Sequence, residues 1–232
     1  MKKYKAVIFD LFGTLVDSFT IAEYEATLKH TALALGVPYD NFRVIWYETA
    51  YDRNTGVYPT TRAMMEHICR KLEVPVEGEQ LDIARDIRHG FVRKEMTPRN
   101  DAVIVLKELR ERGFKTGLIS NCSPVTEEVW DETPFPSLFD VTIFSTSAGI
   151  RKPDPQIFRM ALDGLGVEGE DCIYVGDGDS NELTGAREMG MHPVMISVDY
   201  EKDNDLYVYN RQKWDGPVIS SLTEVLSLLE DE

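Results

Sequence analysis

The chain has 232 residues, of which 43% are hydrophobic, and its 25 basic and 40 acidic residues give a formal net charge of −15. A chain of this length buries roughly three quarters of its unfolded surface, and its ordinary composition excludes disordered, collagen-like and disulfide-scaffold classes. The acidic balance argues against nucleic acid or an anionic membrane as partner, because phosphate-backbone binding needs surplus Lys and Arg, but it leaves a small anionic substrate possible at a locally positive site.

Short apolar runs alternate with helical patterns along most of the chain. Runs that are apolar without alternation predict strands buried on both faces, and they lie at residues 6–9, 116–119, 141–144, 172–175, 193–198 and 218–219. Helices are predicted over residues 100–112, 156–163 and 181–189, and a Ser-Leu-Thr-Glu capping box at residues 221–224 predicts the start of a last helix. This alternation predicts an α/β fold with a Rossmann-like parallel sheet.

The stretch between the first two strands breaks the alternation. It contains no convincing buried strand, and helices are predicted over residues 20–35, 41–53, 60–72 and 79–93. Thr20 and Glu23 form a capping box at the first of these. We expect a small all-helical domain of residues 17–97, inserted after the first strand of a core formed by residues 1–16 and 98–232. The two crossings between the domains are natural hinges.

Cysteine usage and targeting signals indicate little. Cys69, Cys122 and Cys172 lie far apart with no CxxC spacing, so a structural zinc site is not expected, and free thiols suit a reducing compartment. Asp10 interrupts the apolar run near the N-terminus, which argues against a signal peptide, and no apolar run is long enough to span a membrane. We expect a cytoplasmic protein. The sequence leaves the oligomeric state open.

Polar residues gather at the carboxyl ends of the predicted strands, where open α/β sheets bind their ligands. Asp10 follows the first strand, Ser120 and Asn121 the second, and Lys152 the third. Each of these residues alone is explained equally well by a turn, a helix N-cap or the protein surface. Their recurrence at one edge of the sheet indicates a site.

An acidic cluster follows the fourth strand. Asp177, Asp179 and Glu182 fall within six residues beside two glycines, and carboxylate oxygens are the ligands that Mg²⁺ prefers. An acidic helix N-terminus, which the helix dipole favours, is the alternative explanation.

These four motifs, in this order, resemble those of the haloacid dehalogenase superfamily of hydrolases. The segment Asp10-Leu11-Phe12-Gly13-Thr14 is similar to the first motif, Ser120 to the second, Lys152 to the third, and Asp177 with Glu182 to the fourth. The helical insert resembles the small helical cap of that superfamily. The resemblance covers essentially the whole chain and is carried by a specific combination of residues.

The resemblance implies a role for each of these residues. Asp10 would be the nucleophile and form a covalent aspartyl intermediate, while Lys152 would neutralise charge on Asp10 and on the substrate. Residues that would hold substrate oxygens are Thr14, Ser120 and Asn121. The cofactor would be Mg²⁺, and its ligands would be Asp10, the backbone carbonyl of Phe12, Asp177 and Glu182, with Asp179 as an alternative to Glu182.

Phe12 departs from the pattern of the superfamily's phosphatases, which usually carry there an aspartate that protonates the leaving group. Phenylalanine transfers no proton, and general acid catalysis contributes about 10²- to 10⁴-fold in rate. An aromatic residue at this position resembles the family's 2-haloacid dehalogenases, whose halide leaving group needs no proton. Those enzymes use no metal, however, and lack the acidic grouping at Asp177. They also present a cap arginine to the substrate, which Arg43, Arg53 and Arg62 do not clearly match.

Three hypotheses therefore remain open. The first is a Mg²⁺-dependent phosphohydrolase that acts on a small phosphorylated metabolite. The second is a 2-haloacid dehalogenase-type hydrolase, and the third is a weakly active or non-catalytic member that binds a metabolite or a protein partner. In the helical insert we expect Arg53, Tyr58 and Arg62 to contribute to substrate specificity. The identity of the substrate cannot be read from the sequence.

Overall fold

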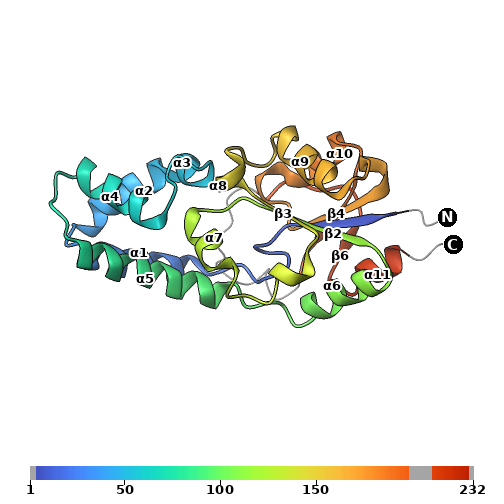
Figure 1. Ribbon diagram of the computed structural model, residues 1–232, viewed down its shortest axis with the longest axis horizontal. Coiled ribbons are helices and arrows are strands. Elements are labelled where there is room, and N and C mark those ends of the chain that lie inside the picture. The colour runs from blue at the N-terminus through green and yellow to red at the C-terminus, as the bar shows by residue number, and fades with distance from the viewer. Residues whose placement is uncertain (1–3, 199–210, 230–232) are drawn as a thin grey trace.

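The computed structural model describes residues 4–198 and 211–229. Within these residues the predicted parallel sheet is confirmed, with six strands in the order β3-β2-β1-β4-β5-β6. The strands are β1 (Ala6–Phe9), β2 (Lys115–Ser120), β3 (Val141–Phe144), β4 (Cys172–Gly176), β5 (His192–Ile196) and β6 (Val218–Ile219). The molecule has a Rossmann-like α/β core, and β1 lies between β2 and β4 (Figure 1).

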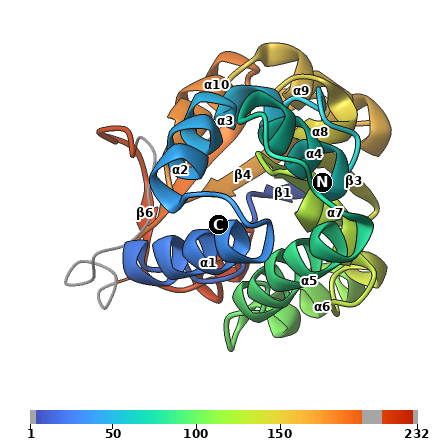
Figure 2. The ribbon, with the colours of Figure 1, turned by 90° about the vertical axis from the view of Figure 1, so that its left-hand side faces the viewer.

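Helices cover both faces of the sheet. Val7 and Phe9 of β1 pack into the core cluster beneath α6 (Ala102–Glu111), α7 (Pro124–Trp130) and α11 (Glu224–Leu228). The alternate residues Ala6 and Ile8 pack beneath α9 (Pro155–Leu165) and α10 (Glu182–Glu188), on the opposite face (Figure 2). Burial on both faces explains why the sequence of β1 is continuously apolar.

Between β1 and β2 the chain forms a helical unit that lies beyond the carboxyl ends of the strands (Figure 1). Its helices are α1 (Ile21–Ala34), α2 (Tyr39–Glu48), α3 (Ala50–Asn54), α4 (Thr61–Lys71) and α5 (Gly78–Glu95). The predicted capping box of Thr20 and Glu23 is present at the start of α1. The unit has a hydrophobic cluster of its own, in which Leu28, Phe42 and Trp46 are nearly or fully buried.

The structure corrects two predicted helices and adds others. The single helix predicted over residues 41–53 is wrong, because it is interrupted at Thr49 between α2 and α3. The hydroxyl of Thr49 donates to the carbonyls of Ile45 at 2.8 Å and Trp46 at 3.3 Å, a competing bond that favours a break in the helix. The last helix begins at Glu224 rather than at residue 221. Elements that were not predicted are α7, α8 (Ser145–Ala148) and the 3₁₀ helices Pro136–Leu138, Gly169–Asp171 and Asp179–Asn181.

The two crossings between the sheet and the helical unit lie side by side. Val16 forms a β-bridge with Pro98, and the backbone N–H of Arg99 donates to the carbonyl of Leu15 at 2.9 Å. The buried guanidinium of Arg99 donates to the carbonyl of Gly13 at 2.9 Å and pairs with Asp17 at 3.1 Å. A single arginine therefore joins the loop after β1 to both crossings.

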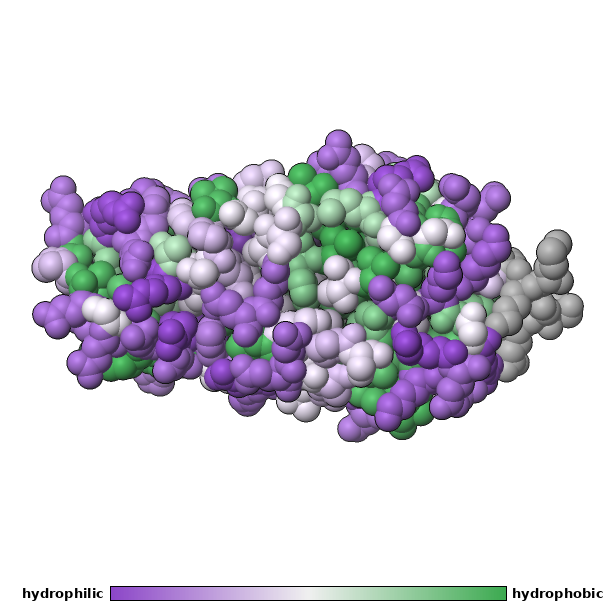
Figure 3. All heavy atoms as spheres, in the orientation of Figure 1, coloured by the Kyte–Doolittle hydropathy of each residue, from purple (hydrophilic) through white to green (hydrophobic). Residues whose placement is uncertain are grey.

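The surface of the helical unit is mostly hydrophilic on the face that Figure 3 shows, where apolar residues form only small groups. None of the helices in residues 4–198 and 211–229 is long and apolar enough to cross a membrane. The three cysteines are buried and unbonded.

Candidate active site

The sheet brings the predicted polar residues together at the carboxyl ends of its central strands. Phe9 pairs with Leu118 of β2 and with Val175 of β4, so the residues that follow these positions meet at one edge. Asp10, directly after β1, donates its backbone N–H to the carbonyl of Val175 at 2.9 Å. Ser120 ends β2, and Asp177 follows β4. This edge faces the helical unit (Figure 1).

Lys152 is the central cation of the site and is 2% exposed. Its Nζ lies 2.5 Å from Asp10 Oδ1 and 2.5 Å from Glu182 Oε2. It also donates to the Ile119 carbonyl at 3.0 Å and lies 3.1 Å from the Tyr174 hydroxyl. Burial alone would lower the pKa of the Lys152 ammonium, but the two carboxylates raise this pKa above its ordinary value. Lys152 therefore stays charged beside Asp10.

Asn121 fixes the backbone of Lys152 rather than standing free. Its Oδ1 accepts from the Lys152 N–H at 2.8 Å, and its Nδ2 donates to the Lys152 carbonyl at 3.2 Å. One hydrogen of the Asn121 amide remains for a substrate oxygen. The residue thus joins the end of β2 to the lysine loop.

Two hydroxyls lie beside the predicted nucleophile. Thr14 is fully buried and donates to Asp10 Oδ2 at 3.2 Å. Ser120 is also fully buried, and its hydroxyl has no hydrogen-bond partner in the described part of the chain. A buried hydroxyl without a partner is costly, so Ser120 is suited to a ligand oxygen.

Three buried carboxylates converge at the same point. One oxygen each of Asp10, Asp177 and Glu182 lies within 4.8 Å of the others. Burial and the neighbouring charge of Asp10 raise the pKa of Asp177 to about 6. Burial, opposed by Lys152, raises the pKa of Glu182 to about 8, and burial also raises the pKa of Asp10. Oxygen donors packed this closely fit a hard divalent cation such as Mg²⁺.

The oxygens of the three carboxylates are not equally free. Glu182 Oε2 accepts from Tyr174 at 2.7 Å in addition to Lys152, and Oε1 accepts from the Gly178 N–H at 3.0 Å. Asp177 Oδ2 pairs with Arg211 at 3.1 Å. Asp10 and Asp177 are therefore the better placed ligands, and Glu182 also positions Lys152. The predicted alternative Asp179 lies outside this cluster of three.

The loop after β1 has to be tight for these carboxylates to meet. Gly13 has φ +78°, in the left-handed region that favours glycine. A Cβ at Gly13 would lie 2.4 Å from Asp177 Oδ2. The glycine thus lets the loop that carries Asp10 approach Asp177.

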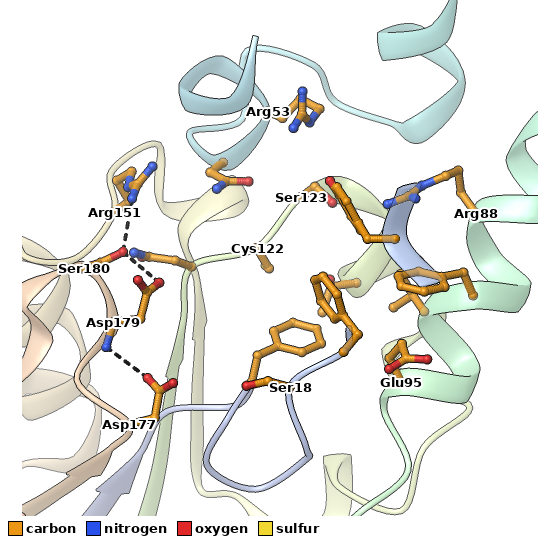
Figure 4. Close-up of a pocket in the computed structure, with 18 residues that line it drawn as sticks. Ser18, Arg53, Arg88, Glu95, Cys122, Ser123, Arg151, Asp177, Asp179 and Ser180 are labelled. Carbon is orange, nitrogen blue, oxygen red and sulfur yellow. Dashed lines mark hydrogen bonds between the residues drawn. The ribbon is translucent and has the colours of Figure 1, made fainter. Parts of the chain in front are cut away.

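A cavity of about 140 Å³ opens above the cluster, between the sheet edge and the helical unit. Figure 4 shows Asp177 and Asp179 on the core side, and Arg53 and Arg88 on the side of the helical unit. Aromatic side chains line much of the wall between them, namely those of Phe12, Phe19, Tyr24 and Phe91. The ring of Phe12 is half-buried and meets the ring of Phe19 edge-on, with centroids 6.4 Å apart.

The residues predicted for specificity differ in their placement. Arg53 lines the cavity and is 3% exposed. Tyr58 packs against His67 inside the helical unit, with ring centroids 5.0 Å apart. Arg62 pairs on the surface with Glu66 at 3.2 Å. The structure brings neither Tyr58 nor Arg62 to the cavity.

Sequence reasoning missed four residues of the site, namely Tyr174, Arg211, Arg88 and Glu95. A signal existed for Arg88, because it lies at a buried position of α5 together with Leu81, Ala84 and Val92, where a charge is unexpected. A signal also existed for Tyr174, a buried aromatic residue whose hydroxyl needs a partner. Glu95 lines the cavity, and burial raises its pKa.

Comparisons with known proteins agree with this arrangement. A glyceraldehyde 3-phosphate phosphatase of Pyrococcus furiosus is 25% identical over 245 residues, which cover 100% of this chain and 95% of the relative. The structure of a phosphatase from Thermococcus onnurineus superposes with a TM-score of 0.64 at 22% identity, covering 97% of both chains. That of a 2-haloacid dehalogenase from Pseudomonas syringae pv. tomato superposes with a TM-score of 0.68 at 22% identity, covering 97% of this chain and 98% of the other.

The two solved structures share the fold with this chain and do not distinguish phosphate from halide chemistry. A family model described as a haloacid dehalogenase-like hydrolase matches residues 4–190. That span contains the helical unit, the strands that carry Asp10, Ser120 and Asp177, and the loop of Lys152. The chain therefore belongs to the haloacid dehalogenase-like hydrolases.

Proposed function

We propose that this hydrolase is a Mg²⁺-dependent phosphatase of small phosphorylated metabolites, with Asp10 as nucleophile and residues 17–97 as a cap. The cluster of Asp10, Asp177 and Glu182, whose oxygens lie within 4.8 Å of one another, is the observation that carries this proposal. The glyceraldehyde 3-phosphate phosphatase named among its relatives supports it.

The charge balance of the cluster favours a metal. Three buried carboxylates face one buried ammonium, and Arg211 adds a second, partly exposed cation. A phosphate group would bring further negative charge to the same point. Buried anions are stable only when they are paired or bind a metal. Displacement of halide from carbon needs one carboxylate and gives no reason for Asp177 and Glu182 beside it.

The reaction follows from these positions. An oxygen of Asp10 attacks phosphorus, the bond from phosphorus to the leaving oxygen breaks, and the leaving oxygen takes a proton from water. Water then attacks the aspartyl phosphate, which releases inorganic phosphate and restores the Asp10 carboxylate. Lys152 and the hydroxyls of Thr14 and Ser120 hold the charged oxygens throughout. Mg²⁺, held by Asp10, Asp177 and the Phe12 carbonyl with support from Glu182, would offset repulsion between carboxylate and phosphate.

Phe12 favours a second candidate function. Its aromatic ring lines the cavity and supplies no proton. A halide departs as a stable anion and needs none, so hydrolysis of a short 2-haloacid remains the alternative.

Hydrolysis of p-nitrophenyl phosphate tests the proposal, because its leaving group needs little help from an acid. We expect turnover that requires Mg²⁺ and is lost in Asp10→Asn. Asp163→Asn removes the same charge from an exposed position on α9 and serves as the matched control with wild-type turnover. Calorimetric titration should show Mg²⁺ binding to the wild type and weaker binding to Asp177→Asn. Chloride release from 2-chloropropionate without metal, together with no phosphatase turnover, would establish the alternative.

A further inference from the structure

Two buried arginines lie on the side of the cavity that the helical unit forms. Arg53 of α3 and Arg88 of α5 are each 3% exposed, and both line the cavity. Their guanidinium carbons lie 4.0 Å and 4.8 Å from the ring centroid of the same residue, Trp46. In Figure 4 both side chains face the cavity, across from Asp177.

Arg53 is incompletely satisfied by the protein. One terminal nitrogen donates to the Trp46 carbonyl and to the Thr49 hydroxyl. Its Nε is buried and has no hydrogen-bond partner, and no carboxylate in residues 4–198 and 211–229 pairs with it. A buried cation without a counter-ion is costly, and stacking on an aromatic ring offsets only part of that cost. The side chain is therefore suited to an anion that enters the cavity.

The second arginine extends the same positive surface. Arg88 stacks on Trp46 and also lies 5.3 Å from the ring centroid of Tyr24 and 5.4 Å from that of Phe91. Glu95 is the acidic residue of the helical unit that lines the cavity, and it already contacts Lys94 at 3.5 Å. In a chain of net charge −15, two cations concentrated on an apolar wall indicate a selected ligand charge.

The size of the cavity limits what the ligand can be. A volume of about 140 Å³ is close to that of an engineered apolar cavity that binds one benzene molecule. A ligand whose phosphate lies at Asp10 therefore has room for only a short chain. The wall between the two charged ends is lined by Phe12 and Phe19, which suit carbon rather than hydroxyl groups.

We propose that Arg53 and Arg88 form an anion subsite, and that the substrate is a short phosphomonoester with a second anionic group, carboxylate or phosphate, at the end opposite the scissile bond. This inference rests on the proposed phosphatase function. It names two residues that select the substrate and gives the substrate a charge at each end. Arg53 contributes a nitrogen without a partner, and Trp46 orients both guanidinium planes.

Binding of non-hydrolysable phosphonates tests the inference separately from turnover. Propylphosphonate carries one anionic group, phosphonopropionate replaces its terminal methyl group by a carboxylate, and ethylenebisphosphonate carries a second phosphonate. Affinities are measured by calorimetry at equal free Mg²⁺, and inhibition of p-nitrophenyl phosphate hydrolysis gives a second value. We expect one of the two dianionic-ended ligands to bind about 10-fold or more tightly than propylphosphonate, since hydrogen bonds to charged groups contribute that much. Which of them binds better identifies the second group.

Variants assign the preference to residues. Arg53→Gln and Arg88→Gln should each reduce the preference for the second anion about 10-fold and leave the affinity for propylphosphonate nearly unchanged. Arg43→Gln is the matched control, because Arg43 stacks on Tyr47 at the outer surface and is paired with Glu25. Its preference should equal that of the wild type. Thermal unfolding shows whether each variant is folded.

If a glutamine variant does not fold, the lysine variant at that position replaces it. Lysine keeps the charge but loses the planar fork of donors, so the preference should still fall. A wild type that binds all three phosphonates equally, or a preference that survives substitution of both arginines, would overturn the inference. So would loss of the preference in Arg151→Gln alone, which would place the subsite on the core side. Absence of p-nitrophenyl phosphate turnover with an intact preference would instead overturn only the phosphatase proposal.

Discussion

Phe12 separates this chain from phosphatases that carry an acid at the same position, and Phe12→Asp would restore one. Phe12 lies two residues after Asp10 and lines the cavity, so a carboxyl group there reaches the side from which the leaving group departs. The wild type should hydrolyse esters with good leaving groups and become much slower as the leaving oxygen becomes more basic. Phe12→Asp should make that dependence shallower.

The size of the effect follows from two opposing contributions. A positioned general acid contributes about 10²- to 10⁴-fold, so on an alkyl phosphate we expect a gain of about 10²-fold. The substitution also removes the edge-on contact with Phe19 at 6.4 Å, an aromatic pair that contributes about 0.5–1.5 kcal/mol. Phe12→Asn loses the same contact and gains no acid. The difference between the two variants therefore isolates proton transfer from the loss of packing.

The assay measures kcat/KM in the presence of Mg²⁺ for p-nitrophenyl phosphate, phenyl phosphate and ethyl phosphate. The ratio of Phe12→Asp to Phe12→Asn should be near one for the first ester and should rise along the series. Equal ratios for all three esters would refute the idea that position 12 faces the leaving group. A wild type with little dependence on the leaving group would show that another residue already supplies the proton, and Glu95→Gln would then be the next variant.

Three further predictions concern the metal cluster and the crossings. The raised pKa values of Asp177, about 6, and Glu182, about 8, mean that the metal-free folded state holds protons that the unfolded chain has released. The melting temperature with EDTA should therefore fall between about pH 5 and pH 8, least in Glu182→Gln, and Mg²⁺ should restore it most at the upper end; a constant or rising value with EDTA contradicts the reasoning. Gly13→Ala should weaken Mg²⁺ binding in calorimetry, since its Cβ would lie 2.4 Å from Asp177 Oδ2, and an unchanged affinity would show that the loop can yield. Arg99→Gln should lower the free energy of unfolding by about 1–3 kcal/mol, measured by urea titration, because the bond to the Gly13 carbonyl and the ion pair are both lost.

The sheet could be predicted from the sequence because its signals are local. The run Ala6–Phe9 is apolar without interruption, and its register against β2 and β4 brings Asp10 to the edge where the other strand-end residues meet. The break at Thr49 was not predictable from the 3.6-residue pattern, which continues through it. It depends on a threonine hydroxyl that competes for two carbonyls. The start of α7 had a signal, since Pro124 is a favourable first-turn residue after Ser123.

The contacts within the site were less accessible to sequence reasoning. Asp10, Lys152 and Asp177 could be named because each ends or follows a strand. The contact of Asn121 with the backbone of Lys152 spans 31 residues, and no local pattern records such a bond. The same holds for Arg88, which reaches the cavity only because α5 packs on α1 within the helical unit.

The loss of the acid and the presence of the two arginines belong to one physical arrangement. An aromatic wall from Phe12 to Phe91 excludes water from the space above Asp10, and a drier site strengthens every charge interaction inside it. Lys152 then holds the scissile phosphate at one end, and Arg53 and Arg88 are placed to hold a second anion at the other. A substrate fixed at both ends is held in line for attack, and positioning of this kind lowers the barrier by a route that needs no proton donor. On this reasoning, removing Arg88 should slow kcat for the matching dianionic ester more than for p-nitrophenyl phosphate, whereas a purely structural arginine would slow both alike.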